Sequence, residues 1–404
     1  MPGPEMLQPL SGAGGSAAPA AGLTKLGPRP DGLRGFVARF ASGNATTVLV
    51  GPGALSRLPA LCAEHGLTGT AGFLCDANLY LLHREQLDAL GKAFGAVLAR
   101  AVREDRKSLA EVEAICDVLA NRGVARDGYV VAAGGGVLTD LAGFAAAIYQ
   151  RGIPWVAAPT TLLSQVDAGF GGKTGANLRG GKNLVGAFHH ARLVVCDAAV
   201  LSTLPVRERW SGLAEIVKCA LIHPALEAGG EPLLERCERT LEAAARGESA
   251  ALAPLVEAAL RLKAEVVCSD EHEGETSSGP WLRAFLNLGH TAGHALESAT
   301  GYSRYTHGEA VALGLKASVA LSRARGLFSE ADADRALALV RRLRVASPGP
   351  LSPAERSAAL AAMAKDKKAR AGKVRFVFLR SGAPPRLDVA SAEEQAAAID
   401  AALA

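Results

Sequence analysis

The sequence lacks the patterns typical of exported, membrane and nucleic-acid-binding proteins. Its seven cysteines are scattered singly with no CxxC pair, which argues against a disulfide framework and fits a reducing compartment. Lys and Arg number 44 against 40 Asp and Glu, and this net charge of +4 comes without a basic run that would indicate nucleic acid. No stretch approaches the roughly 18 uninterrupted apolar residues of a membrane helix. We therefore expect a cytoplasmic protein with neither a nucleic-acid nor a membrane partner.

The start of the chain also lacks a basic segment followed by an apolar core. Residues 1–34 are instead rich in Gly, Pro, Ala and Ser, which predicts a disordered extension and not a signal peptide. The whole chain, with 404 residues, 49% hydrophobic and 21% charged, has globular composition and is long enough for two domains.

Short β-branched runs alternate with helical patterns through the first half of the chain. Their spacing predicts an α/β domain over 35–206, with a mainly parallel sheet and helices on both faces. After Pro205 long helical patterns follow, and these predict a mostly α-helical domain over 207–404. The expected strands are 48–50, 73–75, 97–99, 129–133, 155–158 and 193–196 in the first half and 374–379 in the second; the clearest helical patterns are 233–245 and 252–267.

Three glycines, Gly134, Gly135 and Gly136, lie between an expected strand and an expected helix. Glycine lets backbone amides approach a diphosphate at the positive end of a helix, so the segment is a candidate dinucleotide site. A tight strand-to-helix turn explains the three glycines equally well.

Polar side chains follow other expected strands and favour the nucleotide interpretation. Ligands of open parallel sheets bind beyond the carboxyl ends of the strands, where a carboxylate can accept from ribose hydroxyls. The segment 158–183 is expected to be a Gly-rich loop folded round an anion, with a solvated surface loop as the alternative. The polar residues concerned are Asp76 and Asn78, Thr160 and Thr161, and Asp167, Lys173, Asn177, Lys182 and Asn183.

The second half of the chain contains a candidate metal site. His290 and His294 are four residues apart on an expected helix, His307 follows a loop, and Glu215 on another helix supplies a carboxylate for an N/O ligand set. Two ordinary helix histidines, and a structural ion pair between Glu215 and Lys218, are the alternatives. Arg283 and Asn287 add anchors for an anionic substrate. A dinucleotide, a metal and cationic side chains together indicate alcohol oxidation on an acidic phosphorylated substrate.

Long motifs then occur in a fixed order: GGGVLTDLAGF, RGIPWVAAPTTLLSQVDAGFGGKTG, GKNLVGAF, GLAEIVK, LNLGHTAGHALE, HGEA and DKK. The chain resembles the 3-dehydroquinate synthase family over about residues 35–380. The resemblance implies zinc, or cobalt in its place, on Glu215, His290 and His307, with His294 beside the metal and contacting substrate or relaying protons. It also implies NAD contacts at Asp76, Asn78, Glu104, Lys107, Gly134 to Gly136, Asp140, Thr160, Thr161, Asp167, Lys173 and Lys182. The implied substrate positions are Arg151, Lys173, Asn183, Lys218, Lys263, Arg283, Asn287 and a lysine of the DKK motif, Lys367 or Lys368.

The implied reaction converts 3-deoxy-D-arabino-heptulosonate 7-phosphate, an anionic sugar phosphate, into 3-dehydroquinate and phosphate. It proceeds by transient oxidation, phosphate elimination, re-reduction, ring opening and aldol closure, so NAD is regenerated. Family behaviour implies a homodimer. The alternatives are another sugar phosphate cyclase, making a 2-epi-5-epi-valiolone, inosose or amino-dehydroquinate product, a metal-dependent polyol dehydrogenase, and a binding protein that has lost catalysis. The chain departs from the family pattern at His272 and in an insertion at 274–282.

Overall fold

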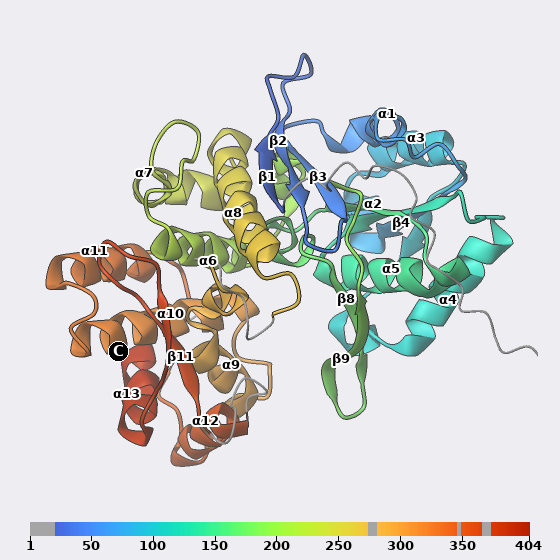
Figure 1. Ribbon diagram of the computed structural model, residues 1–404. Coiled ribbons are helices and arrows are strands. Elements are labelled where there is room, and N and C mark those ends of the chain that lie inside the picture. Colours follow the sequence, from blue (N-terminus) through green and yellow to red (C-terminus); the bar gives the residue numbers. More distant parts are fainter. Residues whose placement is uncertain (1–20, 274–280, 346–348, 366–372) are drawn as a thin grey trace, which may run out of the picture.

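The computed structural model describes residues 21–273, 281–345, 349–365 and 373–404 (Figure 1). Within them a single eight-stranded sheet dominates the N-terminal half. Six neighbouring strands of this sheet, β3, β10, β7, β6, β4 and β5, are parallel, as expected. From edge to edge the strands are β1 (Gly22–Lys25), β2 (Arg34–Arg39), β3 (Ala45–Val50), β10 (Leu193–Cys196), β7 (Trp155–Pro159), β6 (Tyr129–Gly134), β4 (Ala71–Asp76) and β5 (Leu98–Arg100).

The central strands β6, β7 and β10 are buried along their whole length, because helices cover both faces of the sheet. In Figure 1, α1 and α3 lie on one side of the strands and α4 and α5 on the other. This architecture confirms the predicted fold class. The helices of this half are α1 (Leu58–Glu64), α2 (Ala77–Leu82), α3 (Arg84–Phe94), α4 (Leu109–Asn121) and α5 (Gly136–Ile148).

The expected disordered extension over 1–34 is wrong for its last part. Gly22–Lys25 forms strand β1, which pairs antiparallel with β2, and β2 pairs antiparallel with β3. Helix α8 (Ser249–Ser269) of the second half packs against both β1 and β2. This edge of the sheet is therefore antiparallel and covered by the C-terminal half of the chain.

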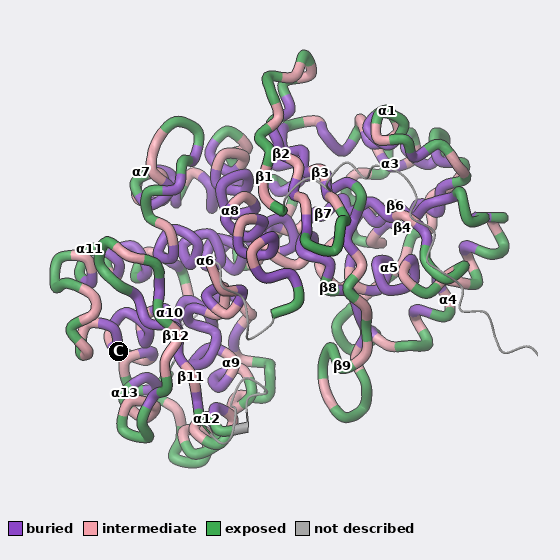
Figure 2. Tube along the Cα trace, viewed as in Figure 1, coloured by how far each residue is buried: buried purple, intermediate pink, exposed green. Residues whose placement is uncertain are grey.

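The C-terminal half is mostly helical, as predicted, with α6 (Val206–Ile222) buried along most of its length (Figure 2). One apolar core runs from the sheet to α6 and α8, and a second lies around α9, α10 and α13. The division at 206 into two domains stays a prediction. Within the described residues no helix combines the length and apolar character needed to cross a membrane. The remaining elements are α7 (Leu233–Ala245), α9 (His290–Ala299), α10 (His307–Ala324), α11 (Glu330–Arg341), α12 (Pro353–Lys365), α13 (Ala392–Leu403), β11 (Arg375–Phe378) and β12 (Arg386–Val389).

Glycines allow α6, α9 and α10 to pack backbone against backbone. A Cβ added at Gly314 of α10 would lie 1.8 Å from the carbonyl oxygen of Gly289, which caps the start of α9. A Cβ at Gly308 would lie 2.0 Å from the carbonyl oxygen of Ser211 on α6. These contacts leave no room for any side chain, so the three helices have fixed separations.

The substitution Gly314→Ala should therefore lower the free energy of unfolding by about 1–3 kcal/mol or more, because the new methyl group meets backbone that cannot move aside as a side chain would. Chemical denaturation measures the loss. Gly27→Ala is the control, since a Cβ there meets nothing within 4 Å. A Gly314→Ala protein as stable as the control would contradict this account of the packing.

Candidate functional site

Helices α6, α9 and α10 bring one carboxylate and three imidazoles together. Glu215 lies in the buried stretch of α6, His290 is the first residue of α9, His294 follows one turn later, and His307 is the first residue of α10. Ligand atoms of the three histidines all lie within 4.8 Å of one another. The Glu215 Oε1 atom is 3.3 Å from His290 Nε2 and 3.4 Å from His307 Nε2.

Glu215 is only 1% exposed, and neither of its carboxylate oxygens accepts a hydrogen bond of normal geometry from the described residues. Burial alone would raise the pKa of Glu215, but the Lys218 ammonium, paired with Oε2, and then His290 hold that pKa well below its usual range. A charged carboxylate oxygen that faces two imidazole nitrogens matches the N/O ligand set of a divalent cation. These residues therefore fit a metal ion.

The ring of His307 is held from its other side by Glu297 of α9, whose Oε2 lies 3.5 Å from Nδ1. Burial would lower the pKa of His307, but Glu215 and Glu297 raise it to about 10. A carboxylate on the second nitrogen is the usual way in which a metal-binding histidine is oriented. The sequence prediction missed Glu297, although its position three residues after His294 puts it on the same face of α9.

His294 lies in the same cluster as His290 and His307, as the HxxxH spacing predicted. Its ring centroid lies 5.2 Å from that of His290 and 5.7 Å from that of His307. Distances alone do not separate His294 from Glu215 as a ligand. The charged Oε1 atom of Glu215, which faces the ring nitrogens of His290 and His307 and has no hydrogen-bond donor among the described residues, favours the carboxylate as the ligand, and His294 then lies beside the metal site.

Cationic side chains surround this cluster. Lys218, one turn after Glu215, is 3% exposed. Burial would lower its pKa, but Glu215 and Asp167 raise it. Lys263 of α8 binds both the side chain and the carbonyl oxygen of Asp167, the latter at 2.6 Å. Burial lowers the pKa of Lys263. Burial would raise the pKa of Asp167, but the nearby Lys263 and Lys218 outweigh this effect and lower the pKa of Asp167. The Lys263 to Asp167 pair thus connects the two halves of the chain at the site.

Arg283 and Asn287 lie at the two ends of a short 3-10 helix that precedes the cluster. The Arg283 side chain is buried, and its guanidinium donates to the carbonyl oxygens of Gly171, at 3.0 Å, and Glu271.

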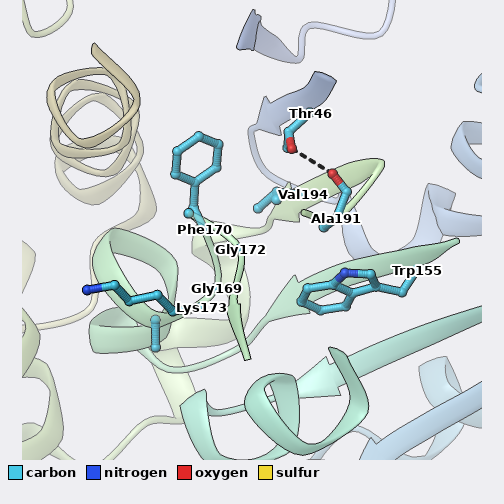
Figure 3. Close-up of a pocket in the computed structure, with 10 residues that line it drawn as sticks. Thr46, Trp155, Gly169, Phe170, Gly172, Lys173, Ala191 and Val194 are labelled. Atoms are coloured by element: carbon cyan, nitrogen blue, oxygen red, sulfur yellow. Dashed lines mark hydrogen bonds between the residues drawn. The ribbon is translucent and has the colours of Figure 1, made fainter. Parts of the chain in front are cut away.

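Lys173 pairs with Glu273 at 2.7 Å, and in Figure 3 its side chain points away from Trp155. The pocket drawn there has a volume of only about 10 Å³, which is room for about one water molecule and no substrate.

A second polar cluster lies at the carboxyl ends of the strands. Lys107 donates to Asn183 Oδ1 at 2.6 Å and to Asp140 on α5, and Asn177 donates to Glu104 Oε1 at 2.9 Å. Burial raises the pKa of Asp140 to about 6, although Lys107 opposes this shift. The structure thus brings together several of the expected NAD-binding residues, with Lys182 3.8 Å from Glu104.

The three glycines lead from β6 into the first turn of α5, as predicted. A Cβ at Gly134 would lie 2.6 Å from the Leu138 side chain, so glycine is required there for packing as well. Thr160 and Thr161 follow the adjacent strand β7, and the Thr160 amide donates to the Gly134 carbonyl at 2.9 Å. Asp76 ends β4, where its Oδ1 caps α2 by accepting from the amides of Asn78 and Leu79. Gly135 and Gly136 are partly exposed, so the start of α5 is a candidate site for a diphosphate.

The expected Gly-rich loop over 158–183 is wrong. Its second part forms a hairpin of β8 (Lys173–Leu178) and β9 (Gly181–Phe188), which projects from the sheet in Figure 1, and Asn183 has a left-handed φ of 51°. Both strands are rich in Gly, Lys and Asn, and β9 is exposed along much of its length, which is why their pattern resembles a loop.

Arg151 is not brought to the site of its own chain. It follows α5, whose 13 residues make a helix about 20 Å long, and so it lies at the opposite end of α5 from Gly136. Its expected contact with substrate in the same chain is therefore not supported by its position. Lys367 and Lys368 lie outside the described residues.

A cleft of about 420 Å³ opens beside His307. The ring of Tyr302, in the loop between α9 and α10, lies under the Lys182 ammonium at 4.5 Å and lines this cleft. Residues from β9, α6, α9 and α10 thus border one opening between the nucleotide-side cluster and the histidine cluster. It is large enough for part of a small-molecule ligand.

Known structures share this fold. The 2-epi-5-epi-valiolone synthase ValA from Streptomyces hygroscopicus subsp. jinggangensis 5008, solved with NAD⁺ and Zn²⁺ bound, matches with a TM-score of 0.74 and 30% identity over 88% of this chain and 96% of that chain. A 2-deoxy-scyllo-inosose synthase complexed with carbaglucose-6-phosphate, NAD⁺ and Co²⁺ matches with a TM-score of 0.76 at 23% identity, over 90% and 99%, which supports the fold alone. The protein therefore has the fold of the sugar phosphate cyclases.

Sequence comparison is more specific. Residues 98–211 match the family described as 3-dehydroquinate synthase N-terminal, and residues 212–369 match 3-dehydroquinate synthase C-terminal. A 3-dehydroquinate synthase from Citrifermentans bemidjiense is 42% identical over 80% of this chain and 86% of its own, and one from Geotalea uraniireducens is 45% identical over 80% and 87%. The chain belongs to the 3-dehydroquinate synthase family.

The convergence of Glu215, His290 and His307 predicts one divalent cation per chain. His290→Ala should lower the zinc content after dialysis well below one equivalent, because a cation held by two remaining ligands dissociates. His294→Ala is the matched control and should retain zinc while losing turnover. Elemental analysis measures both. Full zinc content in the His290→Ala protein would contradict the ligand assignment.

Proposed function

We propose that the protein is a 3-dehydroquinate synthase, which converts 3-deoxy-D-arabino-heptulosonate 7-phosphate into 3-dehydroquinate and phosphate. The observation that carries the proposal is the position of three buried cationic side chains, Lys218, Lys263 and Arg283, around one carboxylate and histidine cluster. Family membership over most of the chain agrees with it. As a lyase it leaves no net change in its NAD.

NAD and one zinc ion, or a cobalt ion, are the proposed cofactors, and they supply reversible oxidation of a substrate hydroxyl and polarisation of its oxygen. Glu215, His290 and His307 would hold the metal, and Glu297 fixes the ring of His307. The amide groups at the start of α5 would hold the cofactor diphosphate.

The protein side chains bind, orient and exchange protons. Lys218, Lys263 and Arg283 bind the negative groups of the substrate in a buried site, where the low dielectric strengthens each contact. Asp167 neutralises Lys263 until substrate arrives. His294, beside the cation, is placed to hold or transfer a proton at the oxygen of the reacting hydroxyl. Asn287, Asn183 and Lys173 complete the proposed substrate contacts.

A homodimer in the cytoplasm is the proposed state of the protein. All seven cysteines lie among the described residues and are free thiols, which suits a reducing compartment. Arg151 matches a substrate position of the family, yet lies one helix length from the start of α5. In a dimer, Arg151 of one copy would be available to the site of the other.

Another sugar phosphate cyclase remains the second candidate, because ValA shares the fold at 30% identity. The two candidates differ in the number of anionic groups on the substrate. A carboxylated sugar phosphate needs two anion sites, and sedoheptulose 7-phosphate needs one. The three buried cations favour the carboxylated substrate.

Activity should need only a trace of NAD, because the hydride removed from the substrate is returned to it in each turnover. Phosphate release and absorbance at the NADH maximum, followed together, test this. Many equivalents of phosphate should appear without accumulating NADH. NADH formed in proportion to substrate consumed would instead identify a polyol dehydrogenase.

Arg283→Lys should fold, keep metal and NAD, and lose about one to two orders of magnitude in kcat/KM on 3-deoxy-D-arabino-heptulosonate 7-phosphate, because a lysine cannot reproduce a bidentate contact worth roughly 1.5–3 kcal/mol. The wild-type protein should strongly prefer this substrate over sedoheptulose 7-phosphate. Equal or faster turnover of sedoheptulose 7-phosphate would show that the family is right and the reaction wrong.

A further inference from the structure

Arg283 is oriented by two backbone carbonyls from different parts of the chain. Its guanidinium donates to Gly171, in the turn before β8, and to Glu271, after α8. These contacts use two of its five N–H donors and leave the others for an anion. The direction in which the free donors point therefore depends on where these two carbonyls lie.

One histidine outside the proposed catalytic cluster contacts both segments. His190, between β9 and β10, has its Nε2 atom 3.0 Å from Glu271 Oε1. A Cβ on Gly172 would lie 2.9 Å from two atoms of the same ring, so the ring covers the backbone next to Gly171. Phe40 stacks on the ring, with centroids 3.7 Å apart and planes inclined by 18°. The ring cannot shift without moving one of the two segments.

The Glu271 carboxylate is fixed by three donors. Ser42 donates through its amide to Oε2 at 2.9 Å and through its hydroxyl to Oε1 at 2.6 Å, and His190 supplies the third contact. Glu271 and His190 are both buried. Charge-assisted hydrogen bonds of this kind have well-defined geometry. The side chain of Glu271 thereby holds the carbonyl oxygen of the same residue against Arg283.

The orientation of the imidazole follows from these contacts. Burial lowers the pKa of His190, and Glu271 only partly opposes this, so the ring is neutral near pH 7. Its Nδ1 atom is buried with no hydrogen-bond partner among the described residues. The proton is accordingly on Nε2, where it is donated to Glu271.

We propose that His190 and Glu271 are positioning residues, which hold the two carbonyls that orient Arg283 toward the anionic substrate. This role rests on the proposed function, in which Arg283 binds a negative group of that substrate. Neither residue touches the substrate itself. Both act through the direction of the Arg283 guanidinium.

His190→Leu should raise the KM for 3-deoxy-D-arabino-heptulosonate 7-phosphate about 3- to 10-fold, because a misdirected guanidinium loses part of its charge-assisted contact. Zinc content and NAD affinity should stay unchanged. His190→Gln keeps an N–H that reaches Glu271 and should restore much of the affinity. His189→Leu is the matched control, since the ring of His189 bonds to Ile153 and to neither of the two segments, and it should leave KM unchanged.

A double-mutant cycle separates positioning from a structural role. In an Arg283→Lys background, His190→Leu should raise KM no further, because the group that it positions is gone. Equal fold-changes in both backgrounds, or an unchanged KM in His190→Leu alone, would overturn the proposal. If His190→Leu does not fold, Ser42→Ala, which removes one donor to Glu271, replaces it in the same cycle with a smaller expected effect.

Calorimetric affinity for the same sugar phosphate gives a second readout that needs no turnover. A wild-type protein that releases no phosphate would contradict the proposed function. Non-additive affinities in the cycle would still support the positioning role, and additive affinities would contradict it.

Discussion

The burial of the Glu215 carboxylate constrains the rest of the site. An uncompensated buried charge costs several kcal/mol, so the surrounding elements must supply positive charge. Lys218 on the same helix supplies part through its ion pair with Oε2, and the other oxygen, Oε1, faces His290 and His307. Close packing through Gly308 and Gly314 fixes the helices that carry these groups. The close packing of α6, α9 and α10 thus brings His290 and His307 to the place where the charge of the Glu215 carboxylate must be compensated.

The cationic groups around this point are held by partners that a substrate can replace or supplement. Lys263 rests on Asp167 across the junction between the two halves, and Arg283 rests on two carbonyls that leave most of its donors free. Groups oriented before substrate arrives lose little entropy on binding. A site of this kind suits a reaction of several steps, because the substrate keeps one position while protons and a hydride move.

The sequence predicted the six parallel strands of the sheet and missed its antiparallel edge, β1 and β2. The central strands β6, β7 and β10 were recognised because continuous apolar runs are typical of strands covered on both faces. Strand β1 was missed because its segment is rich in Gly and Pro and becomes a strand only by pairing with β2. The metal candidates followed from residue type and helical spacing, but the orientation of His307 by Glu297, and of Arg283 by His190, depends on contacts between distant segments. Arg151 was assigned to the substrate site from its motif, and only the structure shows that it lies at the opposite end of α5 from Gly136.

Thermal unfolding with and without zinc tests the central claim most directly, namely that the buried Glu215 carboxylate is matched to a cation. Zinc at one equivalent should raise the unfolding temperature of the metal-free protein by several degrees, since a ligand that binds only the folded state stabilises it. Glu215→Gln should lose most of this shift, because the amide removes the charge that the cation compensates. An equal zinc-dependent shift in both proteins, or none in the wild type, would contradict the account.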